Sequence, residues 1–129
     1  MNIIGLWKVK ELNVVEVNKE THSITRTWRT SEDIAADGSV NPMQKAFAQS
    51  AYKFEEDGTV LSLMPKAIVP AGEGEAYDDE FVIAKRTQWK EENGKLFLAA
   101  EENGKLDWQE MIPAGDSFEV LGYQRIQRA

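Results

Sequence analysis

The sequence predicts an all-β fold, an antiparallel up-and-down β-barrel of about eight strands with two short helices after the first strand. The main observation is a hexapeptide, Glu-Glu-Asn-Gly-Lys-Leu, that occurs at 91–96 and again at 101–106. Each copy centres on Asn-Gly, which favours a two-residue hairpin turn because both central residues need positive φ. Other segments alternate apolar and polar residues with the period of a strand. Because an antiparallel sheet of this size closes or stacks to remove its edges, a barrel is expected.

Length and composition limit the class of protein. The chain has 129 residues, which fits a single domain spanning 1–129. It has no cysteine, which excludes a disulfide framework, a thiol nucleophile and a cysteine-based zinc site. The net charge of −7 disfavours a nucleic-acid partner, because duplex-binding domains present a basic face to phosphate. No apolar run approaches the ~18 residues of a membrane span, and no signal peptide is visible. We therefore expect a cytoplasmic protein, with a removed leader as the alternative.

The first part of the chain reads as strands. Residues 3–17 predict a long first strand, and 24–29 predict a short extended segment. On the first strand, period 2 places Trp7, Val9 and Glu11 on one face, although the pattern is imperfect. Residues 51–64 predict a hairpin that turns at Asp57-Gly58. Both faces of its second strand are apolar, so we expect burial on both sides or cover from the helices.

Two helix start signals lie between these strands. Thr30 followed by Asp33 is a capping-box pattern with Asp in place of Glu, and it predicts a helix over 31–36. Asn41-Pro42 predicts a second helix, with Asn as N-cap and Pro at the first helical position.

The second half of the chain reads as a loop followed by a meander. Residues 65–80 contain two prolines and two glycines and end in an acidic run, which predicts a solvated loop. Residues 81–90 predict the strand that leads into the two Asn-Gly hairpins. Residues 117–127 predict the last strand, after a turn at 113–116.

An ordered set of short motifs resembles the calycin superfamily, which includes lipocalins and fatty-acid-binding proteins. Gly5-Leu6-Trp7 matches the Gly-x-Trp signature of the first strand, and Arg125 stands on the last strand as the closing arginine does. Phe-x-x-Asp-Gly-Thr at 54–59 is similar to the fatty-acid-binding-protein order. The whole chain most resembles small bacterial lipocalin-like domains without an assigned function. The resemblance implies a barrel that binds a small hydrophobic or amphipathic ligand.

The sequence also departs from that superfamily. Lipocalins proper are longer and usually contain disulfides. Fatty-acid-binding proteins carry Arg-x-Tyr on the last strand, whereas here the order is Tyr123-x-Arg125. Neighbours two apart on a strand share a face, so we expect both side chains on one face. As the closing residue of the signature, Arg125 would lie over the Trp7 ring. As a ligand residue, it would grip a carboxylate inside the cavity. We favour the first interpretation.

The candidate ligand-binding side chains are aromatic, sulfur-containing or cationic, the types that line an apolar pocket with a few polar groups. They are Arg125, Tyr123, Trp89, Trp108, Met64, Phe47 and Trp28. The structural signature is Gly5, Trp7 and Arg125. The alternative for each single aromatic residue is plain core packing, and Phe47 on the second helix either forms a lid or plugs one end.

Catalysis has weak support. His22 is the only histidine, and the sequence has no Gly-x-Ser-x-Gly elbow and no phosphate-cradling glycine loop. We therefore expect no catalytic residue, no metal and no cofactor. The leading hypothesis is a monomeric barrel that binds a small hydrophobic or carboxylate ligand. The alternatives are a solid barrel that acts as a protein-interaction module, and an enzyme that uses carboxylates with Arg125 or Arg86 at the barrel mouth.

Overall fold

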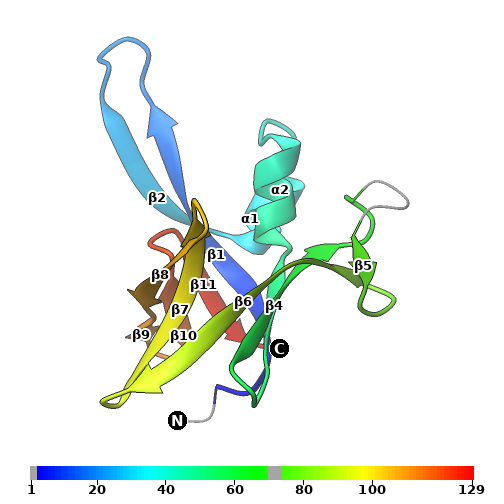
Figure 1. Cartoon of the computed structure of the whole chain (residues 1–129). Helices are drawn as coiled ribbons and strands as arrows, with labels where there is room; N and C mark the ends of the chain where they lie inside the picture. Colours follow the sequence, from blue (N-terminus) through cyan, green and yellow to red (C-terminus); the bar gives the residue numbers. More distant parts are fainter. Residues whose placement is uncertain (1–2, 70–73) are drawn as a thin grey trace.

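The computed structural model describes residues 3–69 and 74–129, which form a nearly closed antiparallel barrel with two short helices at one end (Figure 1). Its elements are β1 (Gly5–Val17), β2 (Ile24–Thr30), α1 (Ser31–Ala36), α2 (Pro42–Ala48), β3 (Ala51–Phe54), β4 (Thr59–Pro65), β5 (Glu75–Ala76), β6 (Phe81–Glu92), β7 (Lys95–Glu102), β8 (Lys105–Glu110), β9 (Ile112–Ala114), β10 (Ser117–Val120) and β11 (Gln124–Arg128). The all-β class and the two helices are as predicted, but the described residues contain eleven strands rather than about eight.

The barrel closes through a bent segment. The strand order is β8-β7-β6-β4-β3-β1-β11-β10-β9, with β2 paired to β1 and β5 paired to β6 off this path. Strands β8 and β9 stand at opposite ends of the order, yet only Met111 separates them in the chain. The Met111 N–H donates to the Leu96 carbonyl at 2.8 Å. Strands β8 and β9 therefore form one bent segment, in which β8 pairs with β7 and β9 pairs with β10.

Strand β1 has different neighbours along its length. Its first residues pair with β3, its middle pairs with β11, and Glu11–Val17 pair with β2. The ladder with β11 has a bulge between Val9 and Glu11. A bulge inserts an extra residue and shifts the alternation. As a result Trp7 and Val9 are buried before the bulge and Leu12 after it, while Glu11 lies on the outer face. The predicted placement of Glu11 with Trp7 is therefore wrong.

The predicted turns and caps agree with the structure where Asn-Gly and cap residues mark them. Asn93 and Gly94 have φ of 54° and 77°, and Asn103 and Gly104 have 51° and 78°. The Thr30 hydroxyl accepts from the Asp33 N–H at 3.1 Å at the start of α1. The Asn41 side chain accepts from the Gln44 N–H at 2.8 Å at the start of α2.

The predicted last strand is in fact a hairpin. Residues 117–127 divide into β10 and β11, because the chain turns at Leu121 and Gly122 with φ of 56° and 77°. A leucine rarely takes the left-handed conformation, so Leu-Gly is a weak turn signal in a sequence.

The main core runs through the barrel and reaches the helices, because Ile34 of α1 and Ala48 of α2 belong to it. Its largest fully buried side chains include Trp7, Phe54 and Ile126. The Trp7 and Phe118 rings meet edge to face, with centroids 5.5 Å apart. The Trp89 indole N–H donates to the Glu55 carbonyl at 2.7 Å. These contacts pack the end of the barrel away from the helices.

A second, smaller cluster covers the outer face of β4. It contains Leu61, Leu63 and Phe81, with Tyr77 and Leu6 packed against it. Strand β4 is thus buried on both faces, as its apolar pattern predicts, and the 77–81 segment supplies the cover. Positions 70–73 of the predicted 65–80 loop lie outside the described residues.

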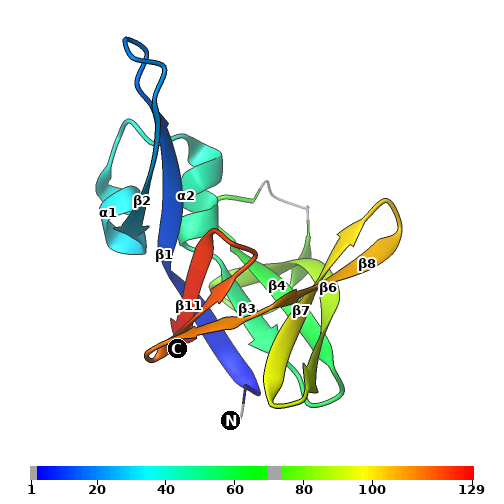
Figure 2. The same cartoon turned by 90° about the vertical axis from the view of Figure 1, so that its left-hand side faces the viewer.

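The β1–β2 hairpin extends beyond the barrel as a two-stranded arm beside the helices (Figure 2). Within the described residues, no helix is long and apolar enough to cross a bilayer.

Candidate functional site

A pocket lies inside the barrel at the end that the helices cover. Its volume is about 200 Å³. Strands β3, β4, β6 and β7, the C-terminal end of α2 and the β10–β11 turn enclose it. The lining residues are Phe47, Ser50, Tyr52, Ser62, Met64, Lys85, Thr87, Leu98, Ala99, Ala100, Glu101, Leu121, Tyr123 and Gln124.

One wall of the pocket is apolar. Phe47 reaches it from α2, Met64 from β4 and Leu98 from β7. Phe47 and Leu121 also pack against the main core. An apolar wall of this kind desolvates a nonpolar ligand group by burying its surface.

The pocket floor carries a buried hydrogen-bonded pair. The Tyr52 hydroxyl donates to Gln124 Oε1 at 2.5 Å, and Gln124 is 1% exposed. Burial raises the pKa of the Tyr52 phenol well above its ordinary value, so the group stays a neutral donor. Among the described residues, no hydrogen bond from Gln124 Nε2 is recorded. Because Gln124 lines the pocket, its amide can donate to an acceptor on a bound molecule.

The other polar groups of the pocket either form hydrogen bonds within the protein or lie at the pocket mouth. The Thr87 hydroxyl donates to the Ala99 carbonyl at 2.7 Å, and the Ser50 hydroxyl donates to the Phe47 carbonyl at 2.7 Å. Burial raises the pKa of Tyr123. Lys85 and Glu101 are exposed at the mouth and take part in none of the ion pairs recorded among the described residues. The mouth therefore carries one charge of each sign.

Leu121 is held in a strained conformation at the pocket wall. Its φ of 56° is in the left-handed region, which costs a bulky L-residue ~1–2 kcal/mol. Such strain persists only where the surrounding structure imposes it. Asn or Gly would suit this turn better, but neither would supply the apolar side chain that Leu121 places between the pocket and the core.

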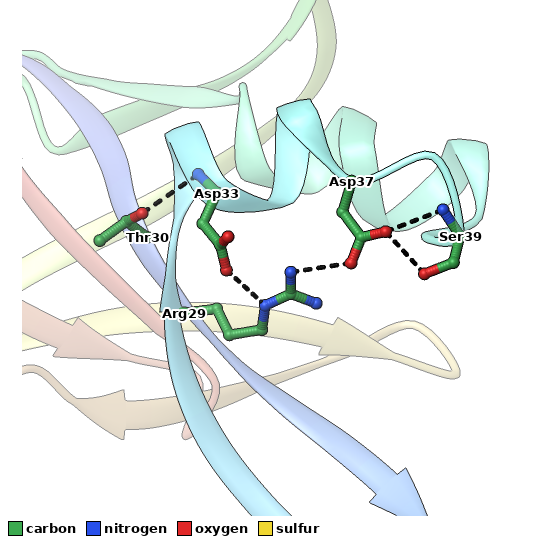
Figure 3. Close-up of polar contacts among 5 residues, drawn as sticks. All are labelled: Arg29, Thr30, Asp33, Asp37 and Ser39. Carbon is green, nitrogen blue, oxygen red and sulfur yellow. Dashed lines mark hydrogen bonds and ion pairs between the residues drawn. The ribbon is translucent and has the colours of Figure 1, made fainter.

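A polar network ties α1 and the following turn to β2, next to the helix that carries Phe47 (Figure 3). Arg29 on β2 donates to Asp33 at 2.7 Å and to Asp37 at 2.9 Å. Asp37 also accepts from the Ser39 hydroxyl at 2.6 Å and from the Ser39 N–H at 2.8 Å. These Ser39 hydrogen bonds, followed by the Arg29 guanidinium, lower the pKa of Asp37 to about 2. The network fixes the start of the helical pair relative to the barrel.

The predicted ligand residues separate into three places. Phe47, Met64 and Tyr123 line the pocket. Trp89 packs against the solid core, with its ring centroid 6.4 Å from that of Phe54. Trp28, Trp108 and Arg125 line none of this pocket. The Lys90 ammonium lies 4.6 Å from the Trp108 ring centroid.

Arg125 differs from its predicted role. Its neighbours Gln124 and Ile126 are buried, so the alternation of β11 turns Arg125 outward. The guanidinium lies 3.9 Å from the Trp28 ring centroid and 3.5 Å from the Glu11 carboxylate. The expected contact with Trp7 is therefore wrong, and so is the expected shared face with Tyr123, because Tyr123 belongs to the turn.

Arg128 makes the contact that was expected of Arg125. Its guanidinium lies 4.7 Å from the Trp7 ring centroid and donates to the Ile4 carbonyl at 2.9 Å. Gly5 leaves room for it, since a Cβ at this position would stand 2.8 Å from Arg128 Nη1. Arg128, rather than Arg125, is therefore the arginine that stands over Trp7 and beside Gly5. Arg86 lies outside the pocket and pairs with Glu75 at 2.7 Å.

Sequence reasoning missed Tyr52, Gln124 and Leu121 as pocket residues. A signal existed for Gln124, because it is the polar member of the inward series Phe118, Val120, Gln124 and Ile126. A polar residue at a core position is normally hydrogen-bonded, and Tyr52 supplies the partner.

The described residues contain no group of three or more His, Cys, Asp or Glu side chains placed to hold a metal ion. No family model, curated protein or solved structure matches the chain. The fold is compatible with a calycin-like barrel, and the family remains a resemblance.

Proposed function

We propose that this chain is a lipocalin-like binding protein that holds a compact amphipathic ligand in the pocket under α2. The observation that carries the proposal is the combination of an apolar wall at Phe47, Met64 and Leu121 with the Gln124 amide at the floor. The apolar part of the ligand contacts the wall, and a hydrogen-bond acceptor on the ligand meets the amide. Binding is non-catalytic and takes place in the cytoplasm.

Pocket size limits the ligand. Sites for drug-sized ligands have volumes of roughly 300–1,000 Å³. The pocket here has about 200 Å³, and the buried side chains of Trp7 and Phe54 occupy the barrel interior beyond it. The ligand is therefore a short-chain or single-ring molecule rather than an extended long-chain lipid.

The proposal is tested with hexanol and hexanoate as probes in a nuclear magnetic resonance titration. The Gln124 side-chain amide signals report directly on the pocket floor. Ala100→Met fills the pocket, and Ala84→Met is the matched control because Ala84 is exposed and lines none of the pocket. We expect both probes to shift the Gln124 signals in the wild type and the control, and neither to do so in Ala100→Met. Unshifted signals in the wild type refute the proposal.

A second candidate function is a protein-interaction module. The observation that favours it is the projecting arm, a feature that ligand binding leaves unexplained. The titration distinguishes the two, because this function requires no occupant in the pocket.

A further inference from the structure

The arm, defined as residues 13–28, leaves the barrel with two unpaired edges. On the β11 side of β1 the last hydrogen bond is from the Asn13 N–H to the Tyr123 carbonyl, at 2.8 Å. Beyond Asn13, β1 pairs only with β2, and β2 pairs only with β1. A two-stranded ribbon of this kind is marginally stable alone in water. The outer part of the arm stands clear of the rest of the barrel in both views (Figures 1 and 2).

The arm exposes apolar side chains on one face. Val15 is 49% exposed, Val17 is 61% exposed and Ile24 is 66% exposed. Val17 lies opposite Ile24 and Val15 lies opposite Arg26, so all four side chains share a face. Clustered exposed apolar residues mark interaction surfaces.

Arg26 is the one charged residue on this face of the arm. It is exposed, and the ion pairs and hydrogen bonds of the described residues do not involve it. The surface that fits the arm is therefore apolar with an unpaired carboxylate at its edge.

The chain contains such a surface. A groove of about 520 Å³ lies between α1, the end of α2 and the segments that follow β4 and precede β6. Five of the thirteen lining side chains are small and apolar: Ala35 and Ala67 are accessible, and Val9, Ala48 and Pro65 lie buried beneath.

The groove carries more negative than positive charge, with three carboxylates and two lysines in its lining. Lys8 pairs with Glu80 at 3.5 Å, while Lys66 donates to the Asp78 carbonyl at 3.4 Å and keeps its charge. Glu32 and Asp79 line the groove, are exposed and take part in no ion pair among the described residues. These two carboxylates complement the Arg26 cation of the arm.

We propose that the chain forms a homodimer in which the arm of each copy docks in the groove of the other. A reciprocal contact of this kind satisfies two-fold symmetry, because each copy supplies the same two surfaces. The paired strands of the arm extend about 17 Å, at roughly 3.3 Å per residue over five residues, which is long enough to lie along a groove of this size. The proposed dimer differs from the monomer expected from the sequence, and it does not depend on ligand binding.

Light scattering during size-exclusion chromatography tests the proposal on the full chain. The wild type is expected to elute with twice the chain mass of 14.6 kDa at high concentration. Val17→Lys/Ile24→Lys is expected to elute as a monomer with an unchanged circular dichroism spectrum, because both residues are exposed. Ile112→Lys is the matched control, since Ile112 is 49% exposed on β9 away from the arm, and it is expected to stay dimeric. A monomeric wild type, or a dimer that survives the arm variant, overturns the proposal.

Exchanging the charges of Arg26 and of the two groove carboxylates tests whether the arm docks in this groove. Arg26→Glu is expected to weaken the dimer at least tenfold, and Glu32→Arg/Asp79→Arg is expected to do the same. Combining all three substitutions is expected to restore the dimer, because the charges again match. A dimer that the arm variant abolishes and the triple variant fails to restore places the arm on another surface and overturns the assignment to the groove.

Discussion

At the scale of single residues, two backbone positions show how the fold depends on side chains far along the chain. Gly5 has φ of 131°, and Arg128 crosses it to reach the Trp7 ring. Leu121 has φ of 56° and carries an apolar side chain into the pocket wall. The first position needs glycine for both space and conformation. The second holds a leucine in a conformation that would suit glycine.

Replacing Leu121 separates its conformation from its side chain. Leu121→Ala removes the apolar contact and keeps the strain, while Leu121→Gly removes both. We expect the glycine variant to be more stable than the alanine variant by roughly 1 kcal/mol, the reverse of the usual order. Urea denaturation of the two variants measures the difference. An alanine variant that is the more stable of the two would show that the turn is not strained.

Gly5 and Arg128 should be energetically coupled. Gly5→Ala is expected to destabilise the fold by about 1–3 kcal/mol, from strain at positive φ and from the close approach of Arg128. Combining it with Arg128→Ala removes the close approach and leaves the backbone strain. A double-mutant cycle from denaturation curves should therefore give a non-zero coupling energy. Strict additivity would contradict the packing of Arg128 over Gly5.

At the scale of elements, strong local signals were reliable and weak ones were not. The Asn-Gly turns and the caps at Thr30 and Asn41 were predicted because those residues satisfy backbone requirements locally. The β10–β11 hairpin was missed because its turn uses Leu121. The bulge of β1 was missed because it depends on pairing with β11, which period 2 in one strand does not reveal.

The Arg29 network makes the anchoring of α1 sensitive to acid. The pKa of Asp37 is lowered from 3.8 to about 2, so its contribution to stability is present above the unfolded value and is lost as the pH falls towards 2. We expect the stability difference between wild type and Asp37→Asn to shrink between pH 4 and pH 2. Denaturation midpoints across this range measure it. A difference that stays constant with pH would show that the Asp37 carboxylate is not stabilised in the folded state.

At the scale of the whole molecule, large aromatic side chains pack one end of the barrel and a pocket occupies the other. Trp7 and Phe54 are buried at the first end, while the larger interior pocket lies beneath α2. The sequence predicted closure and three pocket residues, Phe47, Met64 and Tyr123. The sequence did not show which of the four tryptophans face the barrel interior. Their positions relative to the barrel depend on the register of strands that are distant in sequence.

Substitution of Arg125 tests whether the ligand binds inside the barrel or on its outer face. Arg125→Ala removes the stack on Trp28 and the contact with Glu11 on the outer face. We expect a loss of ~0.5–2 kcal/mol in the free energy of unfolding and no change in hexanol affinity. Phe47→Ala, which opens the pocket wall, is expected to lower that affinity. Calorimetric titration of both variants measures this, and weaker binding in Arg125→Ala alone would place the ligand outside the pocket.

Native mass spectrometry of freshly purified protein, compared with the same sample after denaturation, tests the central claim most directly. A ligand in the pocket predicts a small extra mass that disappears on denaturation and is absent from Ala100→Met. A native mass equal to that of the chain alone, and unchanged after addition of hexanol or hexanoate, would contradict the claim.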